Sequence, residues 1–113
     1  LSINGTVIEH TKKAVEPIEA TLLFDGCKQV QLTGCQVING RTNAVLLRDC
    51  ANVNISGCTF MGANGDATYQ SPLKFEKENT GVLVANCMLS KGAEGEWVMP
   101  KGVGIANGNI VLG

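Results

Sequence analysis

Apolar and polar residues alternate along this chain in a short pattern that occurs five times. The copies begin at residues 1, 30, 53, 82 and 103 and read LSINGTVI, VQLTGCQV, VNISGCTF, VLVANCML and VGIANGNI. In each copy an alternating run precedes a Gly or Asn, and a second run with an apolar end follows. Alternation predicts β-strands. The Gly or Asn tolerates a left-handed backbone, so it predicts a sharp corner between two strands.

A third apolar run precedes the later copies, at 21–24, 44–47, 73–75 and 96–99. Repeats whose starts lie 21 to 29 residues apart indicate stacked units rather than one folded core. We therefore predict an all-β fold, a single-stranded parallel β-helix of about five coils with three strands per coil. Aligning the copies predicts an inward column of Val30, Val53, Val82 and Val103, and a corner column of Gly5, Gly34, Gly57, Asn86 and Asn107.

Composition narrows the class of protein. The chain has 113 residues, 44% hydrophobic and 17% charged, which predicts a single globular domain over residues 1–113. A formal charge of −1 without a Lys/Arg run argues against a nucleic-acid partner. No apolar run has the length of a membrane span. The five Cys include no C-x-x-C pair and the sole His is His10, so no metal site is predicted.

The five repeats resemble the right-handed parallel β-helix of the pectin-lyase-like superfamily, and the resemblance covers nearly the whole chain. It implies a right-handed coil. Insertions at 9–19, 61–71 and 90–95 would then wall a groove that runs along the strands of the third apolar runs and holds polysaccharide. The resemblance further implies an extracellular, cell-surface or virion protein, related either to polysaccharide lyases and glycoside hydrolases or to phage tailspikes.

Charged residues follow the third apolar runs and are the candidate catalytic groups: Asp25, Arg48, Asp49 and Glu78. In the resembled family, lyases use stacked carboxylates to hold Ca²⁺ and a Lys or Arg as base, whereas hydrolases use paired acids. Ca²⁺ is accordingly the one candidate cofactor. The chain lacks the family's Asp-Asp pair and Gly-His-Gly signature. A solvated ladder of alternating charge at a strand end explains the same residues, so both interpretations stay open.

Alignment of the third runs predicts two outward columns, Leu22, Val45, Lys74, Trp97 and Phe24, Leu47, Glu76, Met99. Trp97 beside Lys74 and Glu76 is either a packing residue or a platform on which a sugar stacks, because an indole face suits the C–H face of a pyranose. The other prediction from these columns is an exposed apolar patch of Leu22, Phe24, Val45 and Leu47. Either the 9–19 insertion or the subunits of a homotrimer would cover it.

Cysteines fall in two columns, Cys35, Cys58, Cys87 and Cys27, Cys50. We interpret them as buried, reduced thiols, since a thiol nucleophile needs a nearby base and His10 has no matched partner. No capping helix is visible at either end, so we expect a piece of a longer β-helix or a subunit covered by partners. Two functions remain: a carbohydrate-handling module that binds a polysaccharide or belongs to an enzyme cleaving one, or a structural module of a trimeric phage fibre.

Overall fold

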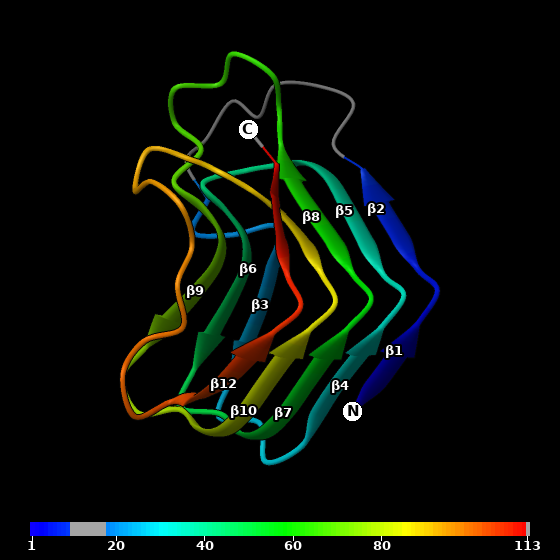
Figure 1. Ribbon diagram of the computed structural model, residues 1–113, viewed down its shortest axis with the longest axis vertical. Helices are drawn as coiled ribbons and strands as arrows, with labels where there is room; N and C mark the ends of the chain where they lie inside the picture. Colours follow the sequence, from blue (N-terminus) through cyan, green and yellow to red (C-terminus); the bar gives the residue numbers. More distant parts are fainter. Residues whose placement is uncertain (10–17, 113) are drawn as a thin grey trace.

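A computed structural model describes residues 1–9 and 18–112 of the chain. Within these ranges the chain forms thirteen strands and no helix. The strands wind as a right-handed β-solenoid of about four turns, and all of its sheets are parallel (Figure 1). The predicted parallel β-helix is therefore confirmed. His10 and most of the predicted 9–19 insertion lie outside the described residues.

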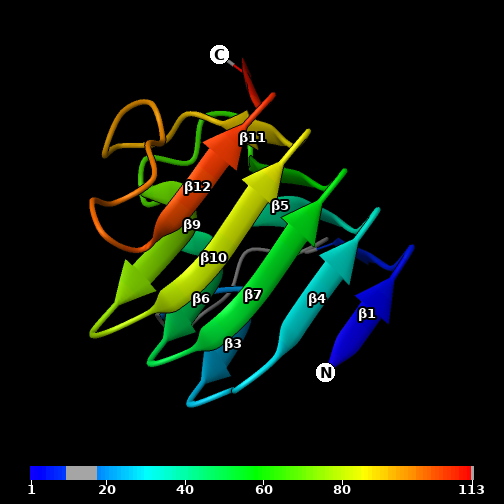
Figure 2. The same cartoon turned by 60° about the horizontal axis from the view of Figure 1, so that its bottom comes forward.

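Three parallel sheets form the walls of the solenoid. Sheet A contains β1 (Ser2–Asn4), β4 (Val30–Thr33), β7 (Ala51–Ser56), β10 (Thr80–Ala85) and β12 (Gly104–Asn107), in that order (Figure 2). Sheet B contains β2 (Val7–Glu9), β5 (Gln36–Gly40), β8 (Thr59–Gly62), β11 (Met88–Ser90) and β13 (Ile110–Leu112). Sheet C has three strands, β3 (Leu22–Asp25), β6 (Asn43–Arg48) and β9 (Ser71–Glu76).

Matching residues of successive coils lie directly beside one another in the interior. Val30 pairs with Val53, which pairs with Val82. The next inward column of sheet A is equally regular, and each of its side chains is 0% exposed: Leu32, Ile55 and Val84. Burying each such side chain contributes roughly 1.5–3 kcal/mol. The vertical columns therefore supply the core, as the alignment of the repeats predicts.

The corner between sheets A and B has a left-handed residue in every coil. Gly5, Gly34, Gly57 and Asn86 have φ between 55° and 62°. The fifth member is Gly108 (φ 70°), so the prediction of Asn107 at this position is wrong by one residue. Gly adopts positive φ at no steric cost, whereas in Asn this conformation brings the Cβ close to the following carbonyl oxygen.

This one-residue shift exchanges the inward and outward positions of β12 relative to the prediction. Val82 pairs with Gly104, not with Val103. Ile105, which the alignment places inside, therefore lies on the outer face and is 68% exposed. The inward positions are taken by the small residues Gly104 and Ala106. The half-buried Trp97 and Met99 pack against the core, and the segment that carries them helps to line the hollow at this end.

The strand register in sheet C also differs from the predicted one. Leu22, Val45 and Leu73 form one column and Phe24, Leu47 and Phe75 the next. Phe24, Val45 and Leu47 are 7%, 0% and 0% exposed and belong to the core. The predicted exposed patch is therefore wrong, because these side chains build the third wall of the interior. The expected strand at 96–99 is also wrong, since that segment lies outside the described strands.

Candidate functional site

The outer face of sheet C carries the charged residues that the sequence singles out. Asp25 lies opposite Arg48, and Arg48 lies opposite Glu76. Two of the candidate catalytic residues, Asp25 and Arg48, are therefore neighbours, and the third member of their column is Glu76. Strand alternation places all three on the solvent side, because their neighbours Phe24, Leu47 and Phe75 point inward.

Arg48 lies at the centre of this charged column. Its Nη2 donates to Glu76 Oε1 at 2.7 Å and to Glu19 Oε1 at 3.1 Å. Its Nη1 lies 3.5 Å from Asp25 Oδ2. The hydrogen bonds to Glu76 raise the pKa of the Arg48 guanidinium still further above its ordinary value, with Glu19 adding to the effect. A guanidinium held this way keeps its proton, so the geometry favours a charge ladder over a general base at Arg48.

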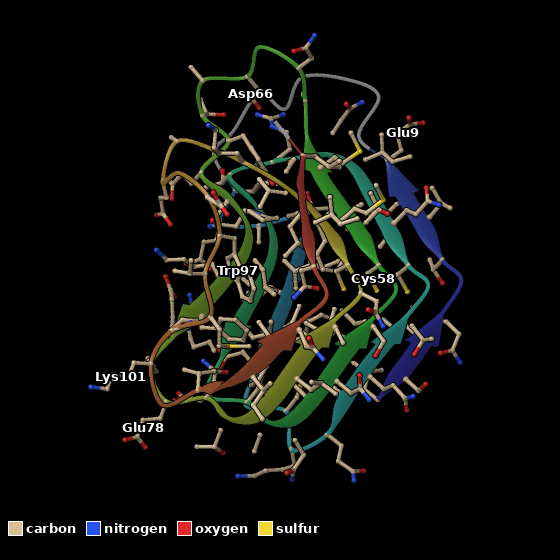
Figure 3. All side chains as sticks on the ribbon, viewed as in Figure 1. Glu9, Cys58, Asp66, Glu78, Trp97 and Lys101 are labelled. Atoms are coloured by element: carbon tan, nitrogen blue, oxygen red, sulfur yellow. The ribbon has the colours of Figure 1, made fainter. Side chains whose placement is uncertain are left out.

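Asp49 and Glu78 lie at the corner that follows sheet C. Asp49 and Lys77 both have left-handed backbones, with φ of 54° and 60°, and their charged groups are 3.9 Å apart. The Glu78 N–H donates to Asp49 Oδ1 at 3.3 Å. Glu78 itself is exposed at the rim of the molecule (Figure 3). In the described ranges, no group of three or more His, Cys, Asp or Glu side chains is placed to hold a metal ion.

Asn79 occupies the same corner as Cys27 and Cys50, and sequence reasoning missed it. It is 3% exposed, and its Oδ1 accepts the Cys50 N–H at 2.9 Å. Its Nδ2 donates to the carbonyls of Leu47 at 3.2 Å and Glu76 at 3.0 Å. Glu78 is the extra residue in this coil, and it displaces Asn79 into the cysteine position. The available signal was the longer spacing between Glu76 and Val82.

The cysteine columns are confirmed as thiols that fill corners. All five are free; Cys27 is half-buried and the other four are buried. Cys58 donates to the carbonyls of Leu32 and Ser56, both at 3.4 Å. The neighbouring Cys87 thiol and burial together raise the pKa of Cys58, and burial raises the pKa of Cys50. Raised pKa values keep Cys50 and Cys58 protonated, which makes them poor nucleophiles. The hydrogen bond with Cys58 instead lowers the pKa of Cys87 to about 7, but Cys87 is 0% exposed, so its sulfur is closed to solvent.

Trp97 and Lys74 come together at a small cavity of about 190 Å³. Lys74 Nζ lies 3.0 and 3.2 Å from the two carboxylate oxygens of Glu94. The Trp97 indole is tilted 43° against the Phe75 ring with centroids 6.4 Å apart, and it points toward the interior (Figure 3). Glu76, the third predicted sugar contact, instead binds Arg48. The structure therefore joins Trp97 to Lys74 but not to Glu76.

A larger hollow of about 760 Å³ lies between the loops inserted after β8 and β11. Tyr69, which sequence reasoning missed, joins the two loops. Its ring packs so closely against Gly62 that a Cβ atom at that position would overlap the ring. Its hydroxyl accepts a hydrogen bond from Ser90 Oγ at 2.9 Å. The Ala93 N–H donates to the Tyr69 carbonyl at 3.0 Å. Burial raises the pKa of Tyr69 to about 12.

Comparison of the chain with protein-family models, with curated proteins and with solved structures gave no match. Among the residues that the structure describes, no helix is long and apolar enough to cross a membrane.

Proposed function

We propose that the chain is a carbohydrate-handling module and that a saccharide binds at the cavity formed by Trp97, Lys74 and Glu94. One observation carries the proposal: a half-buried indole lines this cavity together with an ammonium–carboxylate pair. An indole face packs against the C–H face of a sugar ring. The charged pair offers both donors and acceptors to sugar hydroxyls.

The size of the cavity limits what it holds. About 190 Å³ corresponds to roughly six water molecules at ~30 Å³ each, which suits one sugar ring. A polysaccharide would place one unit there and extend over the outer face of sheet C. Membership of the pectin-lyase-like superfamily is part of this proposal, and the corner column of Gly and Asn supports it. The proposal is binding rather than cleavage, because Arg48 keeps its proton and so does not act as a general base.

The single Trp of the chain makes the proposal directly testable. We expect titration with oligogalacturonate or with a neutral gluco-oligosaccharide to change Trp97 fluorescence in a saturable way. Lys74→Gln and Glu94→Gln each remove charge from the cavity, and we expect each to weaken binding about tenfold, or ~1.4 kcal/mol. Lys77→Gln is the matched control, because Lys77 is an exposed lysine paired with an acid outside the cavity.

Two outcomes would contradict saccharide binding at this place. One is a flat fluorescence titration with both sugar classes. The other is equal weakening by Lys74→Gln and Lys77→Gln. Trp97→Phe keeps an aromatic ring against Phe75, and we expect it to retain the fold while losing affinity. Because this variant has no tryptophan, its affinity is measured by isothermal titration calorimetry.

A structural or assembly module is the second candidate, and exposed apolar pairs favour it. Leu83 lies beside Ile105, and Met88 beside Ile110, on the outer faces of the last two coils. They are 38%, 68%, 40% and 56% exposed. A trimer would have to use a surface other than Phe24, Val45 and Leu47, which are buried. Sedimentation velocity over a concentration series tests this candidate, and a monomer throughout would contradict it.

A further inference from the structure

Four asparagines of this chain are followed directly by glycine, and the structure places them in two kinds of surroundings: Asn4, Asn39, Asn64 and Asn107. Three of them belong to strands β1, β5 and β12, whereas Asn64 lies in the loop after β8. Glycine has no Cβ to shield its backbone nitrogen, so this nitrogen can attack the side-chain amide of a preceding Asn. We propose that Asn64 is a site of spontaneous covalent modification, at which the side-chain amide is converted into an acid.

The reaction consumes only water. The backbone nitrogen of Gly65 gives up its proton and bonds to Cγ of Asn64. The Cγ–Nδ2 bond breaks, and the amide nitrogen leaves with that proton as ammonia. Water then opens the resulting cyclic imide at one of its two carbonyl carbons, which produces aspartate or isoaspartate at position 64. No electrons are transferred, and no oxidant or catalyst is required.

The peptide group between Asn64 and Gly65 is free to reach the geometry of attack. In the ranges that the structure describes, neither the Asn64 carbonyl nor the Gly65 N–H takes part in a hydrogen bond. The Asp66 N–H donates to the Ala63 carbonyl at 3.1 Å and closes a turn whose third residue, Gly65, has φ of 77°. A positive φ at this position is typical of a type II turn, and type I differs from it mainly in the orientation of the central peptide. This peptide can therefore rotate while the turn stays closed.

Space and solvent favour the same event. A Cβ built at Gly65 has no other atom within 4 Å, so rotation of the peptide meets no neighbour. The Asn64 side chain is exposed, which leaves it free to change rotamer and gives water access to the cyclic imide.

Hydrogen bonds of the sheet A ladder fix two of the other three Asn-Gly peptides. At Asn4, the attacking nitrogen would be that of Gly5, whose N–H donates to the Thr33 carbonyl at 2.9 Å. At Asn107, the carbonyl of the linking peptide accepts the Asn86 N–H at 3.0 Å. Rotation of either peptide breaks a bond of the ladder, so attack there requires local opening of a strand.

Close packing fixes the remaining pair, Asn39 and Gly40. Gly40 is buried, and a Cβ built on it would lie 3.0 Å from the Ala44 Cβ and 3.1 Å from the Met61 carbonyl oxygen. The peptide before Gly40 has no room to turn. The fold therefore protects three Asn-Gly pairs by hydrogen bonds or packing and leaves Asn64 unprotected.

Conversion at this position changes the charge of a hollow. Asn64 lines the hollow of about 760 Å³ between the two inserted loops, and the charged residues that line it are Asp66 and Lys91. The Asp66 carboxylate lies 3.9 Å from Arg41 Nε. An acid at position 64 adds a negative charge two residues from Asp66, so the lining changes from balanced to negative and becomes less favourable for anions.

Peptide mapping of the folded full chain measures the reaction at all four positions together. Trypsin separates them, because it cuts after Lys and Arg and yields the peptides 1–12, 29–41, 49–74 and 102–113. After incubation at mildly alkaline pH, we expect Asn64 to be converted about tenfold faster, or more, than any of the other three, since reactions that require local opening are slowed by its free energy. A sample digested without incubation corrects for conversion during digestion.

Unfolding in urea supplies the decisive comparison. The dipeptide is the same at all four positions, so we expect the four rates to converge once the strands are lost. Equal rates in the folded chain, or a slower rate at Asn64, would overturn the inference. A preference for Asn64 that persists unchanged in urea would overturn it as well, because neighbours in the sequence and not the fold would then be its cause.

Two variants control for the chemistry. Asn64→Gln keeps an exposed amide but must close a larger ring, so we expect no conversion at position 64 over the same period and unchanged rates at the other three. Asn64→Asp introduces the charge directly. On isoelectric focusing, the incubated unmodified chain should acquire a band at the position of this variant. An incubated chain without that band, or an Asn64→Gln variant that acquires it equally fast, contradicts modification at Asn64.

Discussion

The middle coil and the last coil contain copies of the same motif and have opposite surroundings. In the middle coil, Val53, Ile55 and Phe60 are 2%, 0% and 0% exposed. In the last coil, Ile105, Ile110 and Val111 are 68%, 56% and 40% exposed. The motif is apolar in both, so apolar character alone does not decide burial. Two things differ. Ile105 and Ile110 face outward, beside Leu83 and Met88, whereas Val111 follows the inward Leu89 but has a neighbouring coil on one side only.

This difference predicts where the stability of the chain resides. The largest contrast is between Phe60→Ala and Ile105→Ala. Phe60 is enclosed by coils on both sides, and we expect its removal to lower the free energy of unfolding by about 3–5 kcal/mol. Ile105 has little buried area to lose, so we expect Ile105→Ala to change the free energy of unfolding by no more than about 0.5 kcal/mol. Urea unfolding followed by circular dichroism measures both.

Equal losses for the two variants would contradict the comparison, since they would mean that the last coil is as enclosed as the middle one. Self-association could produce that result by covering Ile105. The measurements are therefore made at the lowest workable concentration and repeated at a tenfold higher one.

A second contrast uses two asparagines with the same task at different corners. Asn79 accepts from the Cys50 N–H and donates to Leu47 O, and Asn109 accepts from the Cys87 N–H and donates to Val84 O. Asn79 is buried and Asn109 half-buried. We expect Asn79→Ala to cost about 1–3 kcal/mol, because buried backbone groups lose their partners. Asn109→Ala should cost less, because water can replace the amide.

Urea unfolding again gives the two values. A larger loss from Asn109→Ala would show that the corner of the last coil is closed to water and would contradict the greater exposure of Asn109. Asn79→Asp is a useful control, because it preserves the oxygen that accepts from Cys50 while removing the amide donor.

Strand register could be predicted in the first four coils of sheets A and B but not in sheet C, for a reason visible in the residues. In β4 and β7, apolar Val30 and Val53 alternate with polar Gln31 and Asn54, so the pattern itself says which face is inside. In β6, Val45, Leu46 and Leu47 are all apolar. Leu46 lies on the outer face opposite Lys74 and is still only 1% exposed. A run without alternation gives no information on the face, and the alignment was therefore free to slip by one residue.

Some positions in the candidate site could likewise be predicted from the sequence, and others could not. Asp25 and Arg48 stand at the same offset from their corners, so the sequence predicts their pairing. Glu78 interrupts that offset by one residue, and Asn79 takes a place that no alignment assigned to it. Trp97 lies outside the described strands, and its position depends on long-range packing against Phe75 that no local pattern encodes.

The smallest expected effect concerns Tyr69, which lies in a loop beside the solenoid and is 4% exposed. Burial disfavours the charged phenolate and raises the pKa of Tyr69 to about 12, against about 10 for an unfolded chain. Because the folded pKa is the higher one, this contribution to stability is complete below pH 10 and is lost as the pH rises from about 10 to about 12.

Ultraviolet absorbance of tyrosinate reports this group alone, because Tyr69 is the only tyrosine in the chain. We expect a midpoint near pH 12 in the folded protein, and near pH 10 in urea. Tyr69→Phe supplies the control: it abolishes the absorbance change, and its Tm should fall less steeply above pH 10 than that of the unmodified chain. A folded-state midpoint near 10 would mean that water reaches the hydroxyl. The two inserted loops would then be as open as the last coil, and enclosure would be confined to the stacked strands.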